Sequence, residues 1–190
     1  DKVARMLSLP YPGGPHLSAL AKEFRETGKQ NPFKFPRPMI HSDDLDFSFA
    51  GLKTAVLYKI KEIRETNKIT ELSHEVKSQI SEAFEDAATD VLISKTKKAI
   101  EKIMPKSLII GGGVIANTRI REAFKVLSEE HQTSLLVPEL NLTGDNALMI
   151  AFATYIKVLK DPEILNKNID KDRKSAHFSV RALGNLRLGE

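Results

Sequence analysis

The sequence predicts an α/β protein, because long helical segments alternate with short apolar runs of strand type. Within the helical segments, apolar residues recur every three or four positions, which is the spacing of one helix face. These segments are 51–66, 72–104, 117–128 and 143–159. The runs 107–110 and 134–137 are typical of buried strands. Each is followed by a loop that contains glycine and then by a helix.

The N-terminal part is predicted from its proline and glycine content. Residues 1–7 have the pattern of the end of an amphipathic helix, so we expect the chain to be part of a longer protein. Three prolines and two glycines in 9–15 predict a turn, and a helix is expected at 16–27. A basic, proline-broken loop follows at 29–38, and 39–49 is expected to hold one or two short strands.

The longest periodic segment, 72–104, is expected to be one helix or two helices with a bend, ended by Pro105. The stretch 161–190 is charged and poor in apolar residues. We expect it to run over the surface, with an edge strand at 178–181.

Composition limits the classes of protein. At 190 residues the chain can hold one domain or one lobe of a larger enzyme. No cysteine is present, which excludes thiolate metal ligands and disulfides, and no two histidines have metal-ligand spacing. No apolar run approaches the roughly 18 residues that span a bilayer, so we expect a cytoplasmic protein that does not bind membranes. The net charge of +4 is compatible with RNA binding but does not establish it.

A glycine turn is the first candidate site. Gly111, Gly112 and Gly113 follow an apolar run and precede a helix, an arrangement that presents backbone N–H groups to an anion or phosphate. The alternative is tight packing that leaves no room for side chains. The turn has neither the Lys–Ser/Thr of a P-loop nor dinucleotide-fold glycine spacing.

Two polar residues are candidates beside helix starts. Asn117 either caps the next helix or hydrogen-bonds a ribose or acyl group. Asp145 is expected in the first turn of the last helix, where its carboxylate either interacts with the helix dipole or holds a metal ion.

Four segments occur in the order in which they are found in one family. They are DKVARMLSLPYPGGP at 1–15, DFSFAGLKTAV at 46–56, GGVIANTRIR at 112–121 and DNALMIA at 145–151. Together they resemble the TsaD family, the tRNA threonylcarbamoyladenosine transferases, over residues 1 to about 155. The resemblance implies an actin, Hsp70 and sugar-kinase-like fold with ribonuclease H-like sheets. This chain would be the second lobe (1–160), with a helical insertion at about 15–104 and a tail at 161–190.

The resemblance also assigns roles to single residues. Asp1, Gly14 and Ser18 match substrate-binding positions, and Asn117 matches a nucleotide contact. Asp145 matches a metal ligand. The implied metal is divalent, iron with zinc as the alternative, and its other protein ligands would lie in a missing N-terminal half. No residue of this chain is assigned as a covalent nucleophile.

The implied reaction moves a threonylcarbamoyl group from threonylcarbamoyl-adenylate to the N6 amine of an adenosine beside the tRNA anticodon. Implied partners are tRNA and, in bacteria, the proteins TsaB and TsaE. The chain by itself is expected to be inactive. Two alternatives are an ATP-dependent kinase or ATPase of the same superfamily and a non-catalytic scaffold paralogue. Residues 29–37 are a further candidate surface for tRNA.

Overall fold

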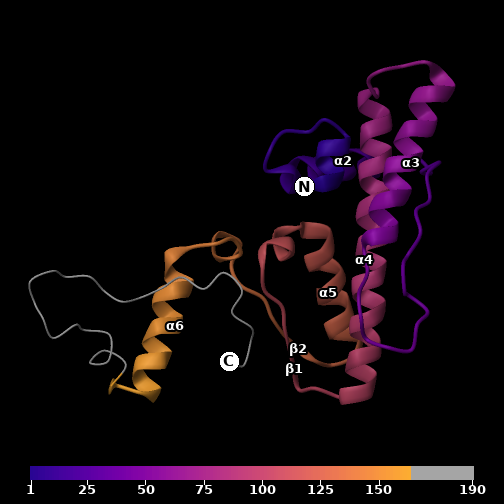
Figure 1. Cartoon of the computed structure of the whole chain (residues 1–190). Helices are drawn as coiled ribbons and strands as arrows, with labels where there is room; N and C mark the ends of the chain where they lie inside the picture. Colours follow the sequence, from indigo (N-terminus) through magenta and orange to yellow (C-terminus); the bar gives the residue numbers. More distant parts are fainter. Residues whose placement is uncertain (164–190) are drawn as a thin grey trace, which may run out of the picture. The chain divides into compact units, whose positions relative to one another are not determined.

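The computed structural model describes residues 1–163, so the tail and edge strand expected beyond residue 163 lie outside the described part. The chain divides into two compact units, residues 1–143 and 144–190. Most of the first unit is helical, and one long helix runs through it (Figure 1).

The chain begins with the short helix α1 (Lys2–Met6), as expected, and continues into α2 (Gly13–Glu26). The prediction of a turn at 9–15 is wrong for residues 13–15, because these three residues form the first turn of α2. The Asp1 Oδ1 atom accepts a hydrogen bond from the Gly13 backbone N–H at 2.9 Å, which satisfies one of the free donors at this helix start. Proline is tolerated in a first turn because its missing N–H has no intrahelical partner there.

Residues 39–49 contain no strand in the structure, so that expectation is wrong. A lysine side chain from a later helix, rather than hydrogen bonds to a neighbouring strand, holds this segment in place. Lys95 is 1% exposed, and its Nζ donates to the Ser42 Oγ at 2.6 Å and to the Asp44 carbonyl oxygen at 2.8 Å. A local hydrophobicity pattern carries no sign of such a contact.

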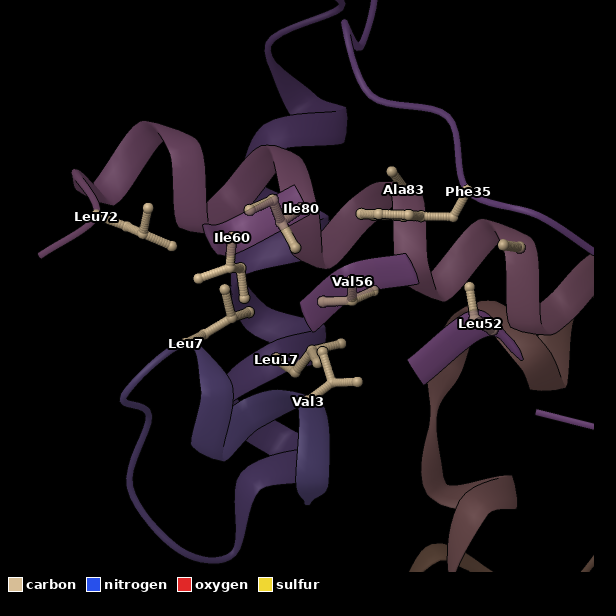
Figure 2. Close-up of a cluster of buried hydrophobic side chains, with 11 residues drawn as sticks. Val3, Leu7, Leu17, Phe35, Leu52, Val56, Ile60, Leu72, Ile80 and Ala83 are labelled. Carbon is tan, nitrogen blue, oxygen red and sulfur yellow. The ribbon is translucent and has the colours of Figure 1, made fainter. Parts of the chain in front are cut away.

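Helices α3 (Ala50–Asn67) and α4 (His74–Ile103) are the long helices of the first unit. α4 is one continuous helix of 30 residues, which decides between the two expected forms. Together with α1, α2 and the loop before α3 they enclose the larger core (Figure 2). Its buried members are Val3, Leu7, Leu17, Phe35, Leu52, Val56, Ile60, Leu72, Ile80, Ala83 and Ala87.

A two-stranded parallel sheet follows α4. β1 (Ser107–Ile109) pairs with β2 (Ser134–Leu136), and α5 (Thr118–Glu130) connects them by way of the 3-10 turn η1 (Gly113–Ala116). α5 packs on the end of α4 around a second core (Figure 1). Both strands were expected, but not their exposure: Ile109 is 77% and Leu136 is 51% exposed.

A second 3-10 turn, η2 (Leu140–Leu142), ends the first unit. In the second unit, α6 (Ala147–Lys160) confirms the last expected helix. Its N-cap is Asn146, whose Oδ1 accepts from the Met149 N–H at 3.1 Å. The α/β class is confirmed, whereas the sheet of the described residues has two strands only. Among residues 1–163, no helix is both long and apolar enough to cross a bilayer.

Candidate functional site

Asn117 is at the centre of a polar cluster that joins three helices. Its Oδ1 accepts a hydrogen bond from the Ile120 N–H at 3.0 Å, so Asn117 is the N-cap of α5, as one of the two interpretations expected. Its Nδ2 donates to the Ser18 Oγ on α2 and to the Glu85 Oε1 on α4, each at 2.6 Å. The same amide therefore caps one helix and links two others.

Three of the expected substrate residues lie along the beginning of α2. Gly14 and Ser18 are four positions apart, so they share one face of the helix. Asp1 contacts the N-terminal end of the same helix through Gly13. A Cβ at Gly13 would collide with the Ala4 side chain, whereas a Cβ at Gly14 would meet nothing within 4 Å. Close packing therefore explains Gly13, and it does not explain Gly14.

The cluster is charged as well as polar. Glu85 is 4% exposed, and its Oε2 accepts from the Arg25 Nη2 at 2.9 Å. Asp86 accepts from Arg25 at 3.3 Å and from Arg119 at 3.4 Å. Burial, the largest single influence, lowers the pKa of the Arg25 guanidinium, but the hydrogen bond and charge of Glu85 and the charges of Asp86 and Glu82 together raise the pKa above its ordinary value. The buried carboxylate is thus matched by a cation and by neutral donors.

The glycine turn differs from the expected strand–turn–helix arrangement. The 3-10 turn η1, which begins at Gly113, lies between the glycines and α5, so the glycines do not form the N-terminus of that helix. Gly112 has φ = +90°, and a Cβ at any of the three would meet nothing within 4 Å. The tight-packing alternative is therefore wrong within the first unit. No hydrogen bond from the Gly111 or Gly112 N–H is formed among residues 1–163.

Asp145 is exposed and belongs to the second unit. The expectation that it lies in the first turn of α6 is wrong, because Asn146 is the N-cap and Asp145 precedes it. Within the described residues, no group of three or more His, Asp or Glu side chains could hold a metal ion.

The basic loop is less available for RNA than its sequence suggests. Arg37 is bonded to the Asp90 carboxylate at 2.8 Å and to the Phe35 carbonyl oxygen at 2.7 Å. Arg37 therefore neutralises a carboxylate of α4. Lys34 in the same loop is exposed.

Glu85 is the residue that sequence reasoning missed. It lies 67 positions from Ser18 and 32 from Asn117, so no local motif contains it. One signal was available: α4 carries a second buried stripe at helical spacing, made of polar residues. Its members are Ser78, Ser81, Glu85 and Thr89.

These features define an α/β protein in which a buried polar cluster ties a strand–loop–helix unit to two longer helices. A family model described as "TsaD: tRNA N6-adenosine threonylcarbamoyltransferase" matches residues 1–152. The chain belongs to the TsaD family, and the resemblance found in its four motifs is confirmed.

Curated relatives carry the same name. The tRNA N6-adenosine threonylcarbamoyltransferase of Neisseria meningitidis is 40% identical over 176 residues, which cover 86% of this chain and 49% of the relative. The protein of that name from Burkholderia cenocepacia is 41% identical over 166 residues, with 87% of this chain and 47% of the relative covered. The chain spans about half the length of the curated relatives it matches.

Proposed function

We propose that this chain is the C-terminal part of a tRNA N6-adenosine threonylcarbamoyltransferase. Family membership supports the activity, and the names of the relatives give the substrate class. The structural observation that carries the proposal is the contact between Asn117 and Ser18, which joins two of the expected substrate residues from distant parts of the sequence.

The proposed reaction is an acyl transfer without a covalent enzyme intermediate. The N6 amine of the tRNA adenosine attacks the carbamoyl carbonyl carbon of threonylcarbamoyl-adenylate. A carbon–nitrogen bond forms, the bond between that carbon and the phosphate oxygen breaks, AMP leaves, and the amine loses one proton to solvent. The task of the protein is to hold the two reactants in the attacking geometry and to stabilise the developing charge.

The residues of the first unit can share the binding of the adenylate. Asn117 Oδ1 uses one lone pair for its cap and keeps a second for a ribose hydroxyl. Asp1 Oδ1 is bonded to Gly13, which leaves the other carboxylate oxygen as an acceptor. The exposed N–H groups of Gly111 and Gly112 suit the phosphate, since a helix or turn with free N–H groups attracts anions. The open face at Gly14 leaves room for the ligand.

A divalent metal, iron or zinc, is part of the proposal through Asp145. The described residues do not form a complete site, so the remaining ligands would come from outside them. Asp145 is exposed and can supply one carboxylate oxygen. We assign it no other role.

The remaining proposals concern the whole enzyme. We propose tRNA and threonylcarbamoyl-adenylate as its substrates, and TsaB and TsaE as its partners in bacteria. An actin-like two-lobed fold and a cytoplasmic location complete the account. The alternation of strands and helices in the first unit supports such a fold.

The test uses the complete protein, meaning the product of the full reading frame that contains these 190 residues. It is incubated with threonylcarbamoyl-adenylate and unmodified tRNA, and the tRNA nucleosides are analysed by mass spectrometry. We expect threonylcarbamoyl-adenosine to form with release of AMP. ATP turnover without transfer would instead favour the kinase or ATPase alternative, and neither activity would favour a scaffold.

A further inference from the structure

Glu85 is the only carboxylate among the described residues that contacts both Ser18 and Asn117. Its Oε1 accepts from the Ser18 Oγ at 2.7 Å and from the Asn117 Nδ2 at 2.6 Å. Its Oε2 accepts from Arg25 at 2.9 Å. With 4% exposure, this carboxylate is bonded almost entirely to protein groups rather than to water.

The chemistry of a carboxylate fixes which way its neighbours point. An ionised carboxylate only accepts hydrogen bonds, so the Asn117 amide must turn its Nδ2 toward Glu85. The Oδ1 then faces the start of α5, where it accepts from Ile120 and keeps one free lone pair. The Ser18 hydroxyl likewise donates its only proton to Glu85, and its oxygen accepts from the Asn117 Nδ2 and keeps one free lone pair.

We infer that Glu85 is a positioning residue for ligand binding, which orients the Asn117 amide and the Ser18 hydroxyl toward the adenylate. The inference rests on the proposed function, because it needs Asn117 and Ser18 to touch that ligand. α4 is suited to the task, because it packs against both α2 and α5. Arg25 supplies the positive charge that stabilises a buried anion at this place.

A purely structural role is the competing explanation. Glu85 also links three helices, so its loss could weaken the fold and reduce binding indirectly. Asp86 gives a matched control: it lies next to Glu85 on α4 and bonds to the same Arg25. Its other hydrogen bond is to Arg119, and it contacts neither Ser18 nor Asn117 by a hydrogen bond.

The experiment compares Glu85→Gln with Asp86→Asn in the complete protein, using AMP as the probe in isothermal titration calorimetry. Glutamine keeps the size of the side chain but replaces one acceptor oxygen with a donor NH₂ group, so it cannot accept the three hydrogen bonds that Glu85 accepts. We expect the Kd for AMP to rise about tenfold with Glu85→Gln, in the range for one charged hydrogen bond, and less than twofold with Asp86→Asn. Thermal unfolding of both variants monitors folding.

A double-mutant cycle separates positioning from structure. If Glu85 acts through Asn117 and Ser18, adding Glu85→Gln to a variant that carries both Asn117→Ala and Ser18→Ala costs no further AMP affinity. Additive losses, or equal losses with Asp86→Asn, would overturn the inference. If the wild-type protein transfers to tRNA but Glu85→Gln binds AMP normally, the positioning role fails and the proposed function stands. If the wild type neither binds AMP nor transfers, both are wrong.

Discussion

The Asn117 Nδ2 atom lies 2.6 Å from the Ser18 Oγ atom, although the two residues are 99 positions apart in the sequence. We propose that both residues bind the substrate. Their contact connects the start of α5 to the first half of α2, and Glu85 bonds to both. Substitutions at this junction give the sharpest tests of the account.

Asn117→Asp should destabilise the chain even though aspartate is as good an N-cap as asparagine. The new carboxylate keeps the capping oxygen but replaces the donor that lies 2.6 Å from the Glu85 carboxylate. Repulsion between two carboxylates disfavours the charged pair, so one of them should take up a proton more readily. We expect urea unfolding at pH 7 to show a loss of about 1–3 kcal/mol, the cost of a lost buried hydrogen bond.

The loss with Asn117→Asp should shrink as the pH is lowered, since protonation of either carboxylate restores a donor. Ser73→Asp is the control, because Ser73 caps α4 through the Val76 N–H at 3.3 Å. Its effect should be small at neutral pH. Equal stability of wild type and Asn117→Asp would contradict the described hydrogen bonds.

Gly13→Ala and Gly14→Ala form a matched pair of neighbours. The added methyl at Gly13 would collide with Ala4, whereas at Gly14 it meets nothing within 4 Å. We expect Gly13→Ala to cost about 1–3 kcal/mol of unfolding free energy, as overpacking does, and Gly14→Ala to leave stability nearly unchanged. If Gly14 lines the ligand site, its variant should still weaken AMP binding in the complete protein. Chemical denaturation and calorimetry check the two effects separately.

Lys95→Met should release the loop that precedes α3. Methionine retains most of the buried stem of Lys95, but the bonds to Ser42 and Asp44 are lost. We expect a loss of about 1–3 kcal/mol and faster protease cleavage within 39–46. Lys98→Met is the control, because its amine bonds only to the Ser42 carbonyl oxygen among the described residues, and it should have a smaller effect.

Two acidic residues should change stability with pH in opposite directions. The hydrogen bonds of Lys95 and Ser42 hold the pKa of Asp44 below its ordinary value, so Asp44 stabilises the fold above its unfolded pKa and loses this effect as pH falls through its folded pKa. Burial, with the charge of Asp86, raises the pKa of Glu82. Glu82 therefore lowers stability as pH rises between its unfolded and folded pKa values.

The measurement is urea unfolding of Asp44→Asn and Glu82→Gln across pH 3–7. Asp44→Asn should be less stable than wild type at neutral pH and approach it in acid. Glu82→Gln should be at least as stable as wild type at neutral pH, with the gain vanishing in acid. The reverse pattern in either variant would contradict the contact assigned to that residue.

The sequence was sufficient where structure depends on neighbouring residues. The helical spacing of Leu52, Val56 and Ile60 predicted α3. The position of Asn117 indicated that it could cap α5. The segment 39–49 was misread because its conformation depends on Lys95, about fifty positions later. Distant contacts of this kind leave no local periodicity.

The candidate site was predictable only in part. The four ordered motifs named most of its residues but could not show that Asn117 and Ser18 touch. Glu85 lies in none of these motifs, and only the polar stripe of α4 marks its buried face. The open space beside Gly111–Gly113 also depends on tertiary structure, since glycines look alike in sequence whether they pack tightly or face solvent.

The central claim is that an adenylate binds at Asn117 and the glycine turn. The most direct test is an AMP titration of the ¹⁵N-labelled complete protein, followed through the backbone amides of Gly111–Gly113 and the side-chain amide of Asn117. The account predicts that these signals shift together with one Kd. In Asn117→Ala, the backbone amide signals of Gly111–Gly113 should shift only at higher AMP concentrations. Binding of AMP that leaves all four residues unchanged would contradict it.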